Sequence, residues 1–184
     1  QALHGLAKNA CKRKYHGTSI KTEYSNEIAI RLILGCLDVV ARRLDVQIIP
    51  QFVENNMHYY RIYVKILNRI DQNEHQGYIT HCRSCGDRNY ITNQKKICEV
   101  CNSKLEIAGP LWIDQLFNKK FIADMIRQIP KLVVRKNCIT ILEKCALEAE
   151  MPPTYYTLDE IASKMKCAPL KMKNAIKILQ DEGF

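Results

Sequence analysis

Glycine is scarce in this sequence of 184 residues, and no two of its seven glycines stand close together. A dinucleotide-binding loop or a P-loop needs several glycines within a few residues, because the backbone must turn tightly and approach the phosphates. The sequence also has no Asp-Pro dipeptide and no His-Glu-x-x-His or Gly-x-Ser-x-Gly motif. These absences exclude the common motifs of nucleotide, zinc-protease and hydrolase chemistry. The chain by itself has the character of a binding module without a catalytic centre.

Long apolar runs are missing as well. The best candidate, residues 28–41, is broken by Arg31 and Asp38, and no basic stretch followed by an apolar one marks a secretory signal. The nine cysteines do not form the regular even framework of a secreted disulfide scaffold. We therefore expect a cytoplasmic protein that makes no use of a membrane. Five isolated cysteines are expected to act as small core side chains: Cys11, Cys36, Cys138, Cys145 and Cys167.

Positive charge exceeds negative charge, with 28 Lys and Arg against 19 Asp and Glu. Residues 1–70 carry 11 basic and 5 acidic groups, residues 71–115 carry 5 and 6, and residues 116–184 carry 12 and 8. A neutral middle between two basic ends indicates a polyanion that contacts both ends, and nucleic acid is the commonest polyanion. A lysine-rich surface that serves only solubility is the alternative.

Residues 25–45 are expected to form an amphipathic helix with Ser25 as its N-cap. Apolar residues recur at spacings of three and four, which places them on one side of a helix. That side is made of Ile28, Leu32, Ile33, Cys36, Leu37, Val40 and Leu44. The opposite side carries Arg31, Asp38, Arg42 and Asp45.

A hairpin is expected over residues 46–67, with a turn at residues 54–56 and an edge position or bend at Pro50. Its second strand alternates in character. Tyr60, Ile62, Val64 and Ile66 would point one way, and Tyr59, Arg61, Tyr63 and Lys65 the other. The second face interleaves aromatic rings with cations, which suits phosphate contacts and base stacking. An ordinary half-exposed strand would show the same pattern.

The last third of the chain is predicted to be helical. We expect one helix from about residue 118 to 129, a second over roughly 134–150, and a helix-turn-helix-like unit over 157–183. Thr157 and Glu160 would form a capping box, Pro169 would open the second helix of the unit, and Gly183 would end it. The residues expected to face inward are Leu158, Ile161, Met165, Met172, Ile176 and Leu179. Such units bind DNA in many proteins, but they also serve as packing or RNA-facing modules.

The strongest local signal is a pair of Cys-x-x-Cys motifs, Cys82/Cys85 and Cys98/Cys101, with twelve residues between them. Each motif forms a knuckle whose thiolates converge on one ion, and the spacer lets the second knuckle complete a tetrahedron. One such motif alone could be a redox centre, but two at this spacing favour zinc. Four thiolates leave no position for water or substrate, so the zinc is expected to be structural. His81 could replace one sulfur, but the four cysteines already fill the shell.

Several segments resemble, in the same order, the C-terminal half of the tRNA (guanine-26-N2) dimethyltransferases, which are S-adenosylmethionine-dependent enzymes. The segments are YHGTSIKTEYSNEIAIRLIL, HYYRIYVKI, the four cysteines, AGPLWIDQLFNKKFIADM and YYTLDEIASKMKCAPLKMKNAIKILQDEGF. The most specific is Gly-Pro-Leu-Trp followed by Leu116, Phe121 and Met125. The family usually has a Tyr-x-His-Glu motif, and this sequence has Asn26 at the position of the histidine.

The resemblance implies an α/β protein in three parts. Residues 1–68 would be the end of a Rossmann-like class I methyltransferase domain, residues 69–115 a zinc-knuckle insertion, and residues 116–184 a mainly helical tRNA-binding domain. The family's glycine-rich cofactor loop and its catalytic Asp-Pro-aromatic-Gly motif are absent. The catalytic residues are therefore expected upstream of Gln1, and this segment alone is expected to be inactive.

The resemblance also implies the cofactors and partner. Zinc would be structural in this segment, S-adenosylmethionine would bind the intact enzyme, and tRNA would be the substrate. The cations that we expect to contact tRNA phosphates are Lys12, Arg13, Lys14, Arg61, Lys65, Lys119 and Lys120. The rival hypothesis is a stand-alone regulator in which a zinc ribbon accompanies a DNA-binding helix-turn-helix.

Overall fold

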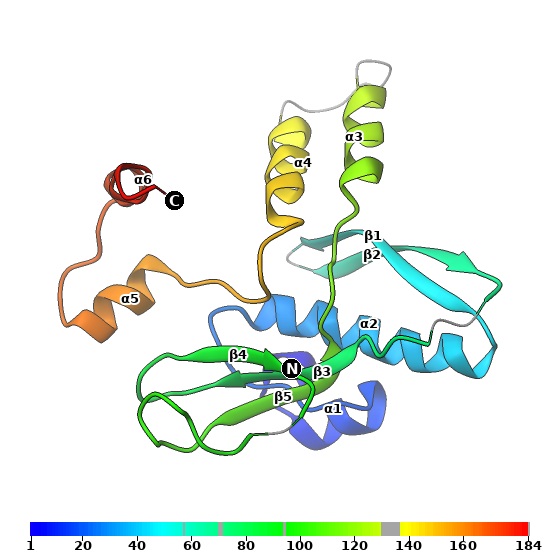
Figure 1. Cartoon of the computed structure of the whole chain (residues 1–184), viewed down its shortest axis with the longest axis horizontal. Coiled ribbons are helices and arrows are strands. Elements are labelled where there is room, and N and C mark those ends of the chain that lie inside the picture. Colours follow the sequence, from blue (N-terminus) through cyan, green and yellow to red (C-terminus); the bar gives the residue numbers. More distant parts are fainter. Residues whose placement is uncertain (57, 70–71, 94, 130–136, 184) are drawn as a thin grey trace.

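The computed structural model describes residues 1–56, 58–69, 72–93, 95–129 and 137–183 (Figure 1). After a short 3-10 helix (Ala2–His4), the elements are α1 (Lys8–Tyr15), α2 (Ser25–Arg43), β1 (Gln47–Asn56), β2 (Tyr59–Leu67), β3 (Gln76–His81), β4 (Arg88–Ile91), β5 (Glu106–Trp112), α3 (Lys119–Gln128), α4 (Asn137–Glu148), α5 (Leu158–Met165) and α6 (Met172–Asp181). The strands form a β1–β2 hairpin and a three-stranded sheet of order β4–β3–β5. All the pairings between these strands are antiparallel. The mixture of helices and strands agrees with the predicted α/β class.

Helix α2 lies between the two sheets and packs against β5 on one side and β1 on the other (Figure 1). The apolar cluster on the β5 side contains Cys11, Ile20, Tyr24, Ile28, Leu32, Ile79, Ala108 and Leu111. The cluster on the hairpin side contains Ile30, Leu34, Ala41, Ile48, Val53, Trp112 and Leu116. The approach to β5 is close at Gly35, where an added Cβ would lie 3.1 Å from the Leu111 Cα. Residues 1–68 and the strands of residues 69–115 therefore share one core.

Packing on two sides makes part of the predicted orientation of α2 wrong. Arg31 and Asp38, expected to face water, are buried. Leu37, Val40 and Leu44, expected on the core side, are exposed. Apolar periodicity locates one buried side of a helix, but it cannot reveal that a second sheet covers the polar side.

The buried polar groups of α2 have partners that make their burial tolerable. Arg31 pairs with Glu27 at 2.9 Å and donates to the backbone oxygen of Trp112 at 3.1 Å. Asp38 pairs with Arg42 at 2.9 Å. Ser25 is the first helical residue rather than the N-cap, a position that Tyr24 occupies.

The β1–β2 hairpin forms over nearly the expected residues. Residues 54–56, predicted as its turn, instead continue β1 and pair with β2, which is a correction. The expected bend is present, because the register shifts between Pro50 and Phe52. The predicted alternation of β2 is confirmed for Tyr60, Ile62 and Val64, which pack against the α2–hairpin cluster. It is wrong for Ile66, which is exposed because it lies near the strand end, beyond that cluster.

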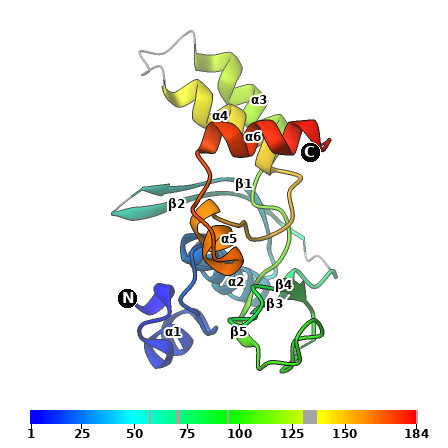
Figure 2. The same ribbon diagram turned by 90° about the vertical axis from the view of Figure 1, so that its left-hand side faces the viewer.

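Helices α3 and α4 pack on each other and extend away from the rest of the molecule (Figures 1 and 2). Phe52 of β1, Ile122 of α3 and Leu142 of α4 form the apolar cluster at their base. The helix expected from residue 118 is confirmed, with the Asn118 side chain accepting from the Phe121 backbone N–H at 3.1 Å. The helix expected over 134–150 is confirmed as α4, and residues 134–136 lie outside the described part.

Helices α5 and α6 are present where two helices were expected, but α6 begins at Met172 rather than at Pro169. Thr157 caps α5 by accepting from the Glu160 backbone N–H at 3.1 Å. Most of the residues expected to face inward are exposed, which corrects the prediction. These are Ile161 and Met165 on α5, and Met172, Ile176 and Leu179 on α6. Each helix buries one alanine, Ala162 or Ala175. A compact helix-turn-helix unit stays a prediction.

The prediction that the isolated cysteines are core side chains holds for some of them and not for others. Cys11 is fully buried in the main core, as predicted, whereas Cys167 is exposed because it lies just beyond the C-terminal end of α5. Within the described residues, no helix has the length and apolar character needed to cross a membrane.

Candidate metal centre and nucleic-acid interface

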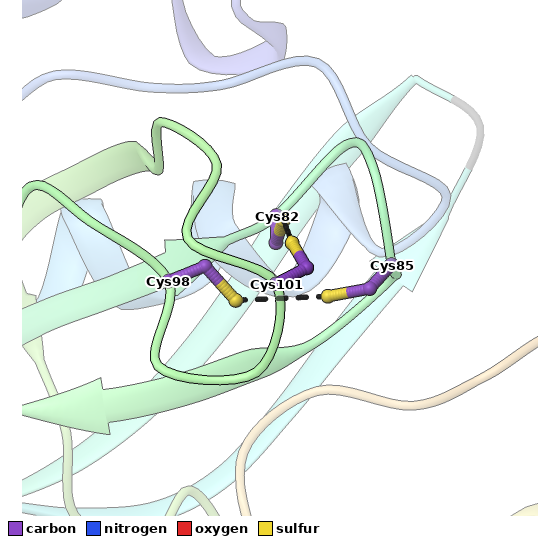
Figure 3. A group of neighbouring side chains, drawn as sticks. All are labelled: Cys82, Cys85, Cys98 and Cys101. Atoms are coloured by element: carbon purple, nitrogen blue, oxygen red, sulfur yellow. Dashed lines mark hydrogen bonds between the residues drawn. The ribbon is translucent and has the colours of Figure 1, made fainter.

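The two Cys-x-x-Cys motifs fold into two turns of the same shape (Figure 3). In the first, the Gly86 N–H donates to the Cys82 carbonyl, and in the second the Asn102 N–H donates to the Cys98 carbonyl, both at 2.9 Å. The residue after each motif has a left-handed backbone, with φ of 85° at Gly86 and 58° at Asn102. Glycine and asparagine are the residues that adopt this conformation most readily, so the local sequence favours both turns.

The turns bring four sulfur atoms together, from Cys82, Cys85, Cys98 and Cys101. All four lie within 4.8 Å of one another. The Sγ–Sγ distances are 3.4 Å between Cys82 and Cys101 and 3.6 Å between Cys85 and Cys98 (Figure 3). Tetrahedral zinc with Zn–S bonds of about 2.3 Å holds its sulfurs about 3.8 Å apart. The cluster therefore has the composition and size of a four-thiolate zinc site.

The surroundings of the sulfurs differ in their effect on ionisation. Hydrogen bonds from the side chain and backbone of Ser103 lower the pKa of the Cys101 thiol to about 6, which favours the thiolate that binds a metal. Burial raises the pKa of the Cys98 thiol. At Cys85 a backbone hydrogen bond from Asp87 lowers the pKa, but burial and the neighbouring thiols outweigh it and raise the pKa to about 12. The site thus contains one sulfur inclined to ionise, Cys101, and two, Cys85 and Cys98, that must lose a proton when an ion binds.

His81 is not part of the cluster of four sulfurs. Its ring Nδ1 lies 2.9 Å from the hydroxyl of Tyr24, and burial, assisted by the nearby Arg88, lowers its pKa. A neutral, buried histidine bonded to a tyrosine joins the cysteine segment to the main core.

The predicted RNA-contacting cations lie on three separate elements. Lys12, Arg13 and Lys14 are exposed on α1, Arg61 and Lys65 on β2, and Lys119 and Lys120 at the start of α3. Helix α1 and the hairpin lie on opposite sides of α2 (Figures 1 and 2). The structure therefore does not gather these seven residues into one patch. Arg61 pairs with Glu54 at 3.0 Å, and Lys119 pairs with Glu150.

A cleft of about 1660 Å³ separates the α2–hairpin layer from α4 and the following linker, and Lys119 and Lys120 are on its wall. Glu27 of α2 connects one wall of this cleft to the linker that follows α4. Both of its carboxylate oxygens accept from the Thr154 backbone N–H at 3.1 Å. His75 pairs with Asp114 and stacks on Trp112 with ring centroids 4.8 Å apart. The wall mixes acidic and basic groups, so it does not form a uniform phosphate-binding surface.

Sequence reasoning missed a second cluster, formed by Tyr24, Arg88 and Glu160. Arg88 is buried, pairs with Glu160 and lies over the ring of Tyr24. Burial raises the pKa of Tyr24, while Arg88 opposes this effect. The only sequence signal was the position of Glu160 in the capping box, because nothing marked Arg88 among the other arginines.

Comparison with known proteins gives one consistent answer. A family model described as N2,N2-dimethylguanosine tRNA methyltransferase matches residues 1–184. The tRNA (guanine(26)-N(2))-dimethyltransferase of Methanobrevibacter smithii is 30% identical over 193 aligned residues, which cover 100% of this chain and 50% of that protein. The tRNA (guanine(26)-N(2)/guanine(27)-N(2))-dimethyltransferase of Aquifex aeolicus is 28% identical over 173 residues, covering 89% and 44%. This chain thus spans about half the length of the curated relatives it matches.

A solved structure has the same fold. It is the complex of Trm1 from Pyrococcus horikoshii with S-adenosyl-L-methionine, with a TM-score of 0.80 and 24% sequence identity. The match covers 98% of this chain and 48% of that one.

Proposed function

The chain belongs to the N2,N2-dimethylguanosine tRNA methyltransferase family, and we propose that it is the C-terminal part of an enzyme that transfers methyl groups from S-adenosylmethionine to guanine N2 in tRNA. The observation that carries the proposal is the family match over all 184 residues. In the intact enzyme an upstream aspartate would orient the guanine amine toward the methyl group. Such an enzyme would work in the cytoplasm.

Residues 1–68 would close the methyltransferase domain. Among the residues that the structure describes, β2 is hydrogen-bonded to β1 on one edge and to no strand on the other. An unpaired strand edge is a ready place for another strand to add. Further strands of the methyltransferase sheet would pair there, and the exposed Leu37 and Val40 of α2 would then be covered by the same part of the enzyme.

Residues 69–115 would bind structural zinc, and residues 116–184 would help to hold tRNA. The four cysteines would hold the ion, which links the two knuckles and leaves no open coordination position. Phosphate contacts would come from the exposed cations on α1, β2 and α3, and these would set affinity without reading bases. A helix-turn-helix arrangement of α5 and α6 would present further lysines to the same polyanion.

Titration of the purified chain with tRNA and with duplex DNA, each at two salt concentrations, tests the proposal. We expect tighter binding to tRNA, with an affinity that falls steeply as salt rises. Site-specific binding to DNA that exceeds binding to tRNA would support the regulator hypothesis instead. The isolated chain should transfer no methyl group, and detectable transfer by it would contradict the assignment of the catalytic residues to the upstream half.

A further inference from the structure

Arg88 stands where three segments of the chain meet, and its side chain is 2% exposed. Its guanidinium pairs with the Glu160 carboxylate on α5 and donates to the backbone oxygen of Tyr155 at 2.6 Å. The Cζ atom lies 4.7 Å from the ring centroid of Tyr24 and 3.9 Å from that of Tyr156. One side chain of the cysteine segment thus contacts the methyltransferase part and the C-terminal part together.

The position of Arg88 is set by the first cysteine knuckle. Strand β4 begins at Arg88, and the Cys82 N–H donates to the carbonyl of the preceding residue, Asp87, at 2.8 Å. Lys164 of α5 adds a second contact to the same knuckle. Its ammonium donates to the carbonyls of Arg83 at 2.5 Å and Ser84 at 3.0 Å, the two residues between the first pair of cysteines.

The contacts of Arg88 demand a guanidinium. A planar cation can pair with a carboxylate, donate to a carbonyl and lie against two aromatic rings at once, whereas a lysine ammonium cannot do all of these. An arginine that is buried with its carboxylate partner cannot contact phosphate directly. Arg88 can therefore affect nucleic-acid binding only indirectly, by fixing the positions of the elements that it contacts.

We propose that Arg88 is a positioning residue for tRNA binding. By fixing α5 on the cysteine knuckle it holds the exposed Lys166, at the C-terminal end of α5, in a set position relative to the cations of the methyltransferase part. Two cationic surfaces held in a set geometry bind one polyanion more tightly than the same surfaces on a loose linker, because the fixed geometry raises the effective concentration for the second contact and lowers the entropy lost on binding. The inference rests on the proposed tRNA-binding function.

The test compares an Arg88→Met/Glu160→Gln variant with Lys95→Met in the 184-residue chain. The double variant removes the cation without leaving a charged carboxylate buried. Lys95→Met removes one exposed positive charge from the same segment. Hydrogen exchange of the α5 amides reports docking, titration reports tRNA affinity, and zinc content together with exchange in α2 reports the fold.

We expect faster exchange in α5 and a loss of tRNA affinity of roughly tenfold or more in the double variant, with zinc content and α2 exchange retained. Lys95→Met should leave α5 exchange unchanged. Arg88→Lys, which keeps the charge, serves if the double variant does not fold, and it should show both effects to a smaller degree.

Unchanged α5 exchange would overturn the inference, and so would faster exchange with unchanged tRNA affinity. Failure of the proposed function gives a different result, since the unmodified chain would then not bind tRNA, and the inference would fall with it.

Discussion

Two arginines of this chain have the same kinds of partner in opposite environments. Arg88 pairs with Glu160 and lies over two tyrosine rings with a side chain that is 2% exposed. Arg61 pairs with Glu54 at 3.0 Å and lies 4.9 Å from the Tyr59 ring centroid, but its side chain is 48% exposed. A buried cation cannot leave its carboxylate without stranding a charge, whereas an exposed one can exchange it for a phosphate at little cost. Burial, and not the type of partner, separates a structural arginine from one that is available for binding.

The largest expected effect comes from disrupting the four-cysteine cluster, whose first knuckle positions Arg88, while leaving Arg61 unchanged. Cys98→Ser should abolish stoichiometric zinc binding and unfold the cysteine segment, because about 10 kcal/mol or more of metal-binding free energy is folding free energy in such sites. Elemental analysis and circular dichroism measure both effects. Cys167→Ser, at an exposed cysteine outside the cluster, is the control and should change neither. Full stability of the chain after chelation would contradict the structural role of zinc.

The second effect compares the two arginines directly. Arg88→Met should lower the free energy of unfolding by about 3–5 kcal/mol, because it leaves the Glu160 carboxylate buried without its cation. Arg61→Met should leave it nearly unchanged, because a solvent-exposed ion pair contributes little to stability. Urea denaturation of both variants measures the difference, and equal costs would remove the distinction drawn between the two sites.

The third effect is the pH dependence of zinc binding by the four cysteines, a dependence that the two arginines do not share. Zinc must displace the proton of Cys98, whose pKa is raised by burial, whereas Cys101, with a pKa of about 6, is already ionised at neutral pH. Zinc binding should therefore release fewer than four protons from the four thiols at neutral pH. Affinity should fall on acidification, by about tenfold per pH unit for each proton released. Calorimetry in buffers of different ionisation enthalpy counts the protons, and a pH-independent affinity would refute this.

The smallest expected effect is on tRNA binding at Arg61. Arg61→Met should weaken binding to different tRNAs about equally and reduce the salt slope by about one, as the loss of one phosphate contact does. The thermal stability of the chain should stay nearly unchanged. Lys95→Met, in the neutral middle of the chain, is the matched control for loss of one charge. A variant that binds tRNA with an unaltered salt slope would remove Arg61 from the interface.

Local features of the fold followed from sequence patterns where the interaction itself is local. The spacing of Cys82, Cys85, Cys98 and Cys101 predicted a cluster of four sulfurs, and the structure has it. Half of the predicted capping box is present, since the Thr157 hydroxyl accepts from the backbone N–H three residues ahead, whereas the Glu160 side chain pairs with Arg88 instead. The cap at Asn118 has the same local geometry but was not predicted. The predicted RNA contacts and the boundaries of the three parts stay predictions.

Features that depend on a second element escaped the sequence. The polar side of α2 was assigned to water because Arg31 and Asp38 are charged, although both are buried. The inward side of α6 was inferred from Met172 and Leu179, although both are exposed. Periodicity measures where apolar residues lie on one helix, but it holds no information about how many surfaces cover that helix.

The sequence by itself determined the cluster of four cysteines, the approximate positions of the helices from α2 onward and the family of the chain, because these depend on neighbouring residues and on short motifs. Only the tertiary structure decided which charged side chains are buried and which segments they join. Arg88 and Glu160 are 72 residues apart, and no local rule pairs them. They meet because the cysteine knuckle and α5 pack against each other. Because water is excluded there, the ion pair is buried and holds two parts of the protein together.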